Sequence, residues 1–182
     1  MMDGPRFIVW RRTDRSFLAL TAVLVFVLAA LVTVLYGIHT VRRIDGASME
    51  PTLLEGDRLL VTRGYEAPAV GDIVSFSAID RHGNTVRLIK RVVALPGDTV
   101  EVFGDLVLVN GAPSEAAPAA IIGTESFHLG PLNVPEGTVY VLGDNRPVSL
   151  DSRFIGPIDL ASVHGKAVAI IVPPSRFGAI DE

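Results

Sequence analysis

Ser48 is the first side chain whose setting suggests chemistry, because it stands between small residues in the stretch GASMEPTL, Gly46–Leu53. A serine hydroxyl is a weak nucleophile until a neighbouring base takes its proton. Four histidines are available for that role: His39, His82, His128 and His164. Since none of them falls in an apolar strand pattern, we interpret all four as surface or turn residues and not as members of a catalytic triad.

Lysine is the other candidate base, and this sequence uses it sparingly. The chain has two lysines, Lys90 and Lys166, against fourteen arginines. Lys90 lies in the run TVRLIKRVVAL, which is typical of a strand. Alternation along that strand places Lys90 on one face with three apolar residues, Val86, Leu88 and Val92. The opposite face receives the two arginines of the run, Arg87 and Arg91.

Lys90 can act as a base only if its surroundings lower its pKa. An arginine stays protonated in proteins, whereas a lysine can lose its proton where its surroundings penalise the charge. Lowering the pKa of a lysine from about 10.4 to roughly 7–8 takes about 4 kcal/mol of preference for the neutral amine. Burial among apolar side chains is large enough to supply it. The alternative is that Lys90 lies on an edge strand and extends its amine into water.

A third segment, GDNRPVSLDSRFIG (Gly143–Gly156), is dense in polar groups. Its charged residues are Asp144, Arg146, Asp151 and Arg153. They are suited to holding a lysine amine and a loop in place. They also suit a structural network in which they pair with one another, and we expect that they partly do.

These three segments follow a long apolar run, Phe17–Ile38, which contains no charged residue. As a helix its 22 residues extend about 33 Å, enough to cross a hydrocarbon core of about 30 Å. A cleaved signal peptide has a shorter apolar region of about 7–15 residues, followed by a small-residue cleavage site. We therefore predict a retained membrane anchor over residues 17–38.

Arginine counts predict the orientation of that anchor. Four arginines precede it (Arg6, Arg11, Arg12 and Arg15) and two follow it (Arg42 and Arg43), so residues 1–16 are expected in the cytoplasm and the remainder outside. The absence of cysteine excludes disulfides and thiolate zinc sites. A net charge of −4, with no basic run outside the membrane flanks, argues against a nucleic-acid partner.

Beyond the anchor the sequence predicts a mostly β fold, because short β-branched runs alternate with turn residues. The predicted strands are 58–62, 73–77, 85–95, 99–109, 138–142 and 166–172. Gly-Asp pairs mark turns at positions 56, 71, 97, 104 and 143. We expect one domain over residues 42–174, with a surface excursion over 110–131 and a polar tail over 175–182.

Taken together, these segments resemble the type I signal peptidases, membrane-bound serine proteases with a Ser-Lys dyad. The resemblance rests on four blocks in order, which are GASMEPTL from Gly46, GDIVSF from Gly71, IKRVVALPGD from Ile89 and GDNRPVSLDSRFIG from Gly143. They cover most of the chain after the anchor. The resemblance implies a compact, multi-stranded signal-peptidase-like β fold behind a single amino-terminal transmembrane helix.

The resemblance also implies a role for each matching residue. Ser48 matches the nucleophile, with its backbone N–H as oxyanion donor, and Lys90 matches the general base. Ser149 matches a hydroxyl that orients the lysine amine, and Asp151 with Arg153 matches a supporting ion pair. The apolar wall of the substrate pocket is matched by Met49, Leu53 and Ile89. One departure is Gly46, where some members have a serine as second oxyanion donor.

The function implied by the resemblance is removal of signal peptides from exported preproteins after a small residue, through an acyl-enzyme. No metal or organic cofactor is implied. The partners would be signal peptides and the lipid bilayer. The catalytic domain would lie on the extracytoplasmic side of the cell membrane. Two alternatives stay open at this point: a specialised Ser-Lys processing peptidase of the conjugative-pilus type, and a non-catalytic, membrane-anchored β-domain that binds peptides. A self-cleaving repressor is disfavoured because a membrane span stands where its DNA-binding unit would be.

Overall fold

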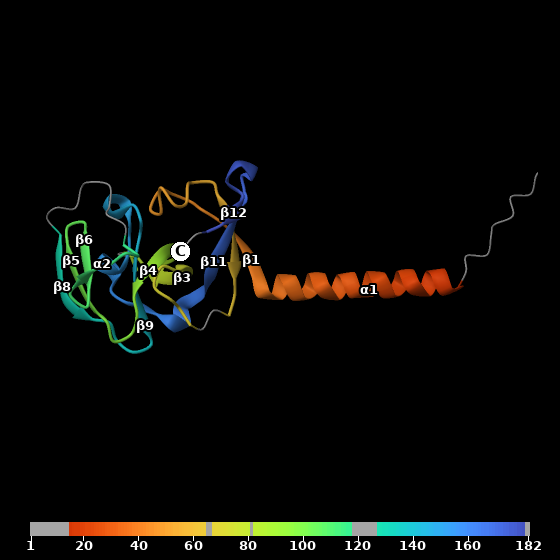
Figure 1. Cartoon of the computed structure of the whole chain (residues 1–182), viewed down its shortest axis with the longest axis horizontal. Coiled ribbons are helices and arrows are strands. Elements are labelled where there is room, and N and C mark those ends of the chain that lie inside the picture. The colour runs from red at the N-terminus through yellow and green to blue at the C-terminus, as the bar shows by residue number, and fades with distance from the viewer. Residues whose placement is uncertain (1–14, 65–66, 81, 118–126, 181–182) are drawn as a thin grey trace, which may run out of the picture. The chain divides into compact units, whose positions relative to one another are not determined.

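The computed structural model describes residues 15–64, 67–80, 82–117 and 127–180, and Figure 1 shows its helices and strands. The chain divides into two compact units, Met1–Gly37 and Ile38–Glu182. We call the second of these the β unit.

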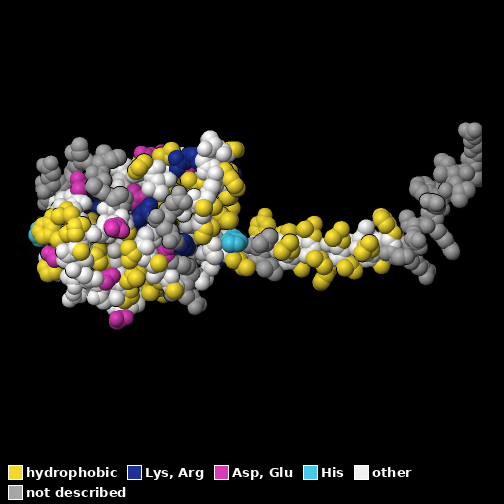
Figure 2. Space-filling view, in the orientation of Figure 1, with side chains coloured by type: hydrophobic (Ala, Val, Ile, Leu, Met, Phe, Trp, Pro, Cys, Tyr) yellow, Lys and Arg dark blue, Asp and Glu magenta, His cyan; other side chains and the backbone are white. Residues whose placement is uncertain are grey.

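The described part of the first unit is the helix α1, Arg15–Ile38, whose last residue belongs to the β unit. Its segment Phe17–Ile38 is long and apolar enough to cross a membrane, and it is the one such helix among the described residues. Figure 2 shows hydrophobic side chains along its length. The hydroxyls of Thr21 and Thr33 donate to carbonyls one turn back, at Phe17 and Ala29, so these two polar groups are satisfied within the helix. This segment coincides with the predicted anchor.

The β unit is built mainly from strands that form two antiparallel sheets. The larger sheet contains β1 (His39–Arg43), β2 (Arg58–Thr62), β3 (Ile73–Ile79), β4 (Thr85–Ala94), β9 (Thr138–Leu142), β10 (Ile158–Asp159), β11 (Val163–Val172) and β12 (Gly178–Ala179). Its strand order is β1-β2-β11-β3-β4-β9-β10, with β12 paired to β11. The smaller sheet has the order β7-β6-β5-β8 and contains β5 (Thr99–Phe103), β6 (Leu106–Val109), β7 (Ala112–Pro113) and β8 (His128–Asn133). The mostly β prediction is confirmed.

Short helical turns connect these strands. They are η1 (Arg146–Val148), α2 (Ser152–Ile155), η2 (Leu160–Ser162) and η3 (Pro174–Arg176). Asp151 begins α2 by accepting a hydrogen bond from the backbone N–H of Arg153, and Asp159 begins η2 in the same way with Ala161.

The single strand predicted over 99–109 is two strands. Phe103 pairs with Leu106, so Gly104 and Asp105 form a two-residue hairpin loop between β5 and β6. Gly104 has φ 58°, a left-handed conformation that glycine adopts without steric cost. The Gly-Asp pair therefore ends one strand and starts the next.

Two segments predicted as irregular also contain strands. The predicted excursion over 110–131 includes β7 and the start of β8; residues 118–126 lie outside the described part of the chain. In the predicted tail, β12 pairs with β11, and Ile180 packs against buried residues such as Leu59 and Ile170. Arg176 contributes an ion pair with Asp57. Propensity missed these strands because backbone pairing and packing, not local composition, stabilise them.

Three groups of buried side chains form the core. One lies under the small sheet and includes Val100, Val102 and Tyr140. The other two pack on the large sheet: one includes Val74, Phe76 and Val141, and the other includes Met49, Leu53, Leu59, Val61 and Ile73. Because β3 contributes Ile73 to one group and Val74 to the other, its two faces are both covered. The loop that carries Ser48 and the strand that carries Lys90 are thus held on a sheet buried from both sides.

Candidate active site

Ser48 and Lys90 lie within hydrogen-bonding distance of each other. Ser48 is in the turn between β1 and β2, and this turn is closed by hydrogen bonds from the Glu50 N–H to the Ala47 carbonyl and from the Leu53 N–H to the Met49 carbonyl. Nζ of Lys90, on β4, lies 2.7 Å from Oγ of Ser48. The two groups are 42 residues apart in sequence, so the tertiary fold brings them together.

The amine of Lys90 is buried, and burial brings its pKa closer to physiological pH. Lys90 is 2% exposed, which excludes the alternative in which it extends into water. Burial lowers the pKa of Lys90 to about 8, against the opposing influence of the nearby Asp151 and Asp144 carboxylates. At pH 7 roughly one molecule in ten then carries a neutral amine, compared with about one in 2,500 for an unperturbed lysine.

Ser149 does not make the hydrogen bond that the resemblance implied. Its hydroxyl is buried and has no hydrogen-bond partner among the described residues. The second partner of the Lys90 amine is instead the Ile89 carbonyl, at 2.8 Å. Ser149 packs closely against Gly143: a Cβ at Gly143 would overlap the Ser149 hydroxyl and would come 2.5 Å from the Ser48 carbonyl oxygen. The missing side chain at position 143 lets these two serine-bearing segments approach each other.

Asp151 is the centre of a buried ionic network beside the dyad. Both of its carboxylate oxygens accept from the Arg153 guanidinium, at 2.8 and 3.0 Å, and Oδ2 also accepts from the Gly143 N–H. Arg153 donates in addition to the Arg146 carbonyl, and Arg146 Nε donates to the Gly143 carbonyl. Pairing within the segment is therefore found for Asp151 with Arg153. The Arg146 side chain donates to a backbone carbonyl and not to a carboxylate, and the Arg146 carbonyl accepts from Arg153.

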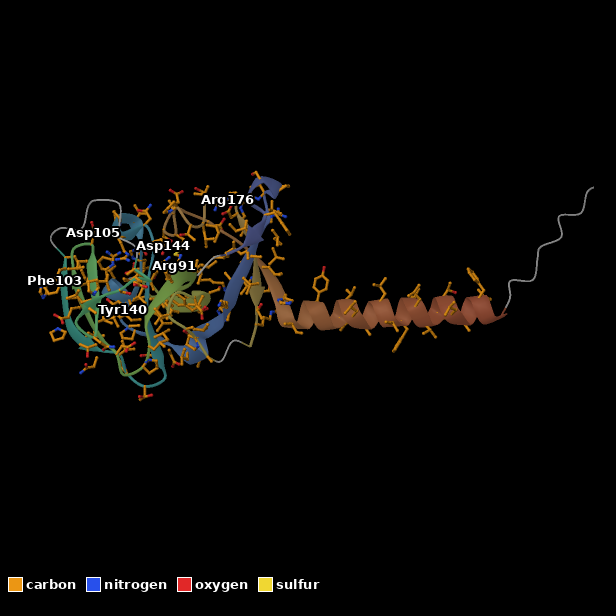
Figure 3. The ribbon with its side chains drawn as sticks, viewed as in Figure 1. Arg91, Phe103, Asp105, Tyr140, Asp144 and Arg176 are labelled. Atoms are coloured by element: carbon orange, nitrogen blue, oxygen red, sulfur yellow. The ribbon has the colours of Figure 1, made fainter. Side chains whose placement is uncertain are left out.

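Asp144 pairs with Arg91, a residue that the sequence reading had placed on the face away from Lys90. The pair is bidentate, with Nε to Oδ1 at 3.0 Å and Nη2 to Oδ2 at 2.9 Å, and both side chains are buried. Figure 3 labels both side chains. Thr52 adds a hydroxyl bond of 2.6 Å to Oδ2 of Asp144. This group ties the Ser48 turn, β4 and the Gly143–Gly156 segment together.

Arg91 and Asn145 are the two site residues that the sequence reading missed. Asn145 donates from its side chain to the Ala47 carbonyl and from its backbone N–H to the Ser48 carbonyl, both at 3.1 Å. Arg91 directly follows Lys90, but alternation assigns it to the opposite face, and the sequence gives no sign that β4 is buried on both faces.

The three predicted pocket residues do not share one environment. Met49 and Leu53 are 2% and 0% exposed and pack in the core, so in this structure they are closed off from a substrate. Ile89 is half-buried beside the dyad lysine. A groove of about 390 Å³ lies next to Ser149 and is lined mainly by Pro147, Val148, Leu150, Phe154, Asp80 and His82. The turn at Ser48 needs an apolar underside, which is what Met49 and Leu53 supply.

The histidines have partners other than Ser48. His39 lies 3.2 Å from the Thr62 hydroxyl, His164 lies 2.8 Å from the Ser77 hydroxyl, and His128 packs edge-on against Phe103. These three histidines lie in the strands β1, β11 and β8 and not in turns; His128 is exposed, as expected of a surface residue, and His39 and His164 are half-buried. His82 is in the loop between β3 and β4. Among the described residues there is also no group of three or more histidines and carboxylates that could hold a metal ion.

A serine hydroxyl in contact with a buried lysine amine, with no histidine at the pair, is typical of serine hydrolases whose base is a lysine. Comparison with known proteins identifies the group within this class. Residues 16–172 match the family described as signal peptidase, peptidase S26, and the chain belongs to this family. It is thus a serine peptidase.

Several relatives are similar over most of the chain. The signal peptidase I of Leptolyngbya laminosa is 38% identical over 147 residues, which is 76% of this chain and 71% of that protein. The signal peptidase I of Bacillus licheniformis is 36% identical over 152 residues, 76% and 79% of the two chains. A crystal structure of a signal peptidase I from Enterococcus faecalis is 36% identical and covers 55% of this chain and 96% of its own, with a TM-score of 0.44.

Proposed function

We propose that this chain is a membrane-anchored endopeptidase that removes signal peptides from exported preproteins, with Ser48 as nucleophile and Lys90 as general base. The observation that carries the proposal is the 2.7 Å separation between Oγ of Ser48 and a lysine amine that is 2% exposed. Membership of the signal peptidase family supports the substrate class. The segment Phe17–Ile38 would hold the enzyme in the membrane, with the β unit on the extracytoplasmic side as the flanking arginines indicate.

In the acylation step, the neutral Lys90 amine takes the proton of Ser48 as Oγ attacks the carbonyl carbon of the scissile peptide. Negative charge then develops on the carbonyl oxygen, and the Ser48 backbone N–H is suited to stabilise it. Gly46, two residues before Ser48, offers no hydroxyl as a second donor. Burial raises the fraction of Lys90 that is neutral and able to accept this proton, and this is the main contribution of the fold to the step.

The same amine serves the later steps. The Lys90 ammonium formed by acylation protonates the leaving nitrogen, which releases the mature protein and restores the neutral base. Lys90 then takes a proton from a water molecule as its oxygen attacks the ester carbonyl, and the ammonium gives that proton to Oγ of Ser48 as the ester C–O bond breaks and the signal peptide is released. Asp144 and Asp151 favour the ammonium form, and they thereby stabilise the charge that Lys90 gains in each transition state.

The substrate would bind as an extended segment next to the Ser48 turn, with alternate side chains entering pockets. Ile89 is the one predicted pocket residue that stays partly accessible, and an apolar side chain there suits the small residue before the cut. The anchor raises the effective concentration of a substrate tethered to the same bilayer. These assignments separate the enzyme from a non-catalytic peptide-binding domain, which would need neither Ser48 nor Lys90.

The decisive experiment is cleavage of a labelled preprotein by the full chain in detergent micelles. Ser48→Ala and Lys90→Arg should each lower turnover by roughly four orders of magnitude or more, because neither variant can form the activated nucleophile. Lys166→Arg is the matched control, since it makes the same exchange at the other lysine, which pairs with Asp72. Cleavage retained by Lys90→Arg would refute the base assignment, and cleavage retained by Ser48→Ala would refute the nucleophile.

A further inference from the structure

A groove beside the dyad has no role in the catalytic steps. Its volume is about 390 Å³, and two segments line it: Asp80 and His82 from the loop between β3 and β4, and Pro147–Leu150 with Phe154 from the η1–α2 region. Two of its apolar residues, Val148 and Phe154, are 62% and 48% exposed. We call this feature the Val148 groove. A space of this size with apolar walls and a few polar groups is typical of a ligand site.

One end of the Val148 groove lies at the dyad. Ser149 belongs to its lining, and the Ser149 hydroxyl and the Ser48 carbonyl oxygen both crowd the position that a Cβ at Gly143 would occupy. Gly143 directly follows the β9 residue that pairs with Arg91. Since Arg91 is the neighbour of Lys90, this end of the groove is level with the catalytic lysine along β4.

The other end of the groove lies at the start of β4. Asp80 directly follows the β3 residue that pairs with Thr85, so this wall stands at the turn from β3 into β4. The backbone N–H groups of His82 and Asn84 donate to Oδ1 of Asp80, both at 2.8 Å, and hold the loop in shape. The bond from Asn84, followed by that from His82, lowers the pKa of Asp80 and keeps its carboxylate ionised. The groove thus follows β4 from Lys90 back to Thr85.

Along this stretch one edge of β4 is open to a further strand. β3 pairs with β4 from Thr85 to Arg91, whereas β9 pairs with it from Arg91 to Ala94. Within the described part of the chain, residues 85–90 therefore have no strand partner on the β9 side. The groove lies on that side, because its 147–154 wall belongs to the segment that leaves β9. An extended peptide can add to such an edge, with alternate side chains entering pockets.

The position of Ile89 indicates which part of the substrate reaches the groove. In the proposed function the residue before the cut contacts Ile89, which lies on the Thr85 side of Lys90. Residues further into the signal peptide then continue along β4 at about 3.3 Å each and reach Thr85 about four residues later. Signal peptides carry their apolar region before the cleavage site. We propose that the Val148 groove binds one apolar side chain of the signal peptide, about four to six residues before the cut.

This role of the Val148 groove rests on the proposed function, because it requires the peptide to pass Ile89. The groove would add a second point of selection, distant from the small residue next to the cut. The Asp80 carboxylate at its far end would also repel an acidic side chain. A peptide with aspartate at the grooved position should therefore bind less tightly than one with leucine.

The test is binding of fluorescein-labelled signal peptides to the full chain in a nonionic detergent, measured by fluorescence anisotropy. The protein carries Ser48→Ala so that the peptides stay intact. Each pair of peptides has leucine or aspartate at one position, beginning four residues before the cut and moving away from it, or in the first residues after it. We expect aspartate to weaken binding about ten-fold at one position in the proposed window and less than about two-fold elsewhere.

Val148→Lys should remove this preference. Its ammonium would pair with the aspartate of the peptide, so the ratio of the two dissociation constants at that position should fall to about two or below. Val172→Lys is the matched control, since Val172 is also an exposed valine but lies at the end of β11, outside the groove lining. Comparing two peptides on one protein cancels any effect of a variant on folding or on Lys90, and micelle partition is the same for every variant.

A penalty for aspartate within the window that Val148→Lys relieves and Val172→Lys leaves in place supports the proposal. A penalty that is equal at all positions, that falls after the cut or that both variants relieve equally overturns it. Cleavage of the leucine peptide by the chain with Ser48 intact is measured alongside. Its absence would count against the proposed function, whereas the binding pattern would still decide whether the groove holds the apolar side chain.

Discussion

The pH dependence of cleavage should follow the titration of Lys90. Only the neutral amine can accept the Ser48 proton, and burial places the pKa of Lys90 at about 8. The neutral fraction therefore rises from about 0.1 at pH 7 to about 0.9 at pH 9. We expect kcat/KM for a preprotein to increase roughly ten-fold over that interval along a single ascending limb, because kcat/KM reports the ionisation of the free enzyme.

The charges around Lys90 predict how that limb moves. Asp151 and Asp144 both raise the pKa of Lys90 against the effect of burial. Asp144→Asn removes one of these charges, so the limb should move to lower pH. Lys166→Arg should leave the limb in place, because Lys166 pairs with Asp72 and not with Ser48.

The assay is initial-rate cleavage of a fluorogenic signal-peptide substrate in detergent from pH 5.5 to 10.5, at substrate concentrations well below KM. Thermal unfolding at each pH identifies any loss of folded enzyme. A limb centred near 6.5 would point to a histidine as the base, and one centred near 10.5 would point to a solvated lysine. Either result, or a limb that does not respond to Asp144→Asn, would contradict the proposed electrostatics.

Three further predictions concern stability and geometry. Lys90→Met should raise the free energy of unfolding by about 2 kcal/mol at pH 7. The folded-state pKa of Lys90, about 8, lies below the usual lysine value, so its charge destabilises the fold, and the lost hydrogen bonds offset part of the gain from removing it. Thermal unfolding should show this gain in full below pH 8 and its disappearance as pH rises above 10.5. Asp151→Asn should destabilise the fold by about 3–5 kcal/mol in the same thermal unfolding assay, because it leaves the buried Arg153 guanidinium without its carboxylate. An unchanged unfolding midpoint temperature would show that the pair is dispensable. Gly143→Ala should reduce cleavage about 100-fold, because its methyl group would displace the Ser48 carbonyl, while Gly178→Ala, which has open space around it, serves as the control and should cleave normally.

Much of the fold could be predicted from local patterns. The strands 58–62 and 138–142 begin and end where the β-branched runs do, and the span 17–38 is defined by the absence of charge. The strands β7, β8 and β12 were missed, because proline, glycine and alanine have low strand propensity and only pairing with a neighbour makes them extended.

The candidate site shows the same division. Ser48 and Lys90 stood out by residue type and setting, and the Asp151–Arg153 pair was expected. The pocket-wall roles of Met49 and Leu53 and the orienting role of Ser149 stay predictions: the first two are buried and the Ser149 hydroxyl has no hydrogen-bond partner among the described residues, features that depend on how segments pack. The ion pair between Arg91 and Asp144 could not be predicted, because strand alternation does not reveal that β4 is covered on both faces.

The amino-acid sequence by itself determined a membrane-spanning helix, a mostly β unit and the two side chains able to act as nucleophile and base. These features depend on composition and on spacing between near neighbours, which the linear chain specifies directly. The tertiary structure alone decided that the Lys90 amine is dry, that it lies 2.7 Å from Ser48 and that Arg91 pairs with Asp144. The pKa of Lys90 near 8 and the Arg91–Asp144 pair both arise from distances between groups far apart in sequence, because burial and electrostatic interactions act through space and not along the chain.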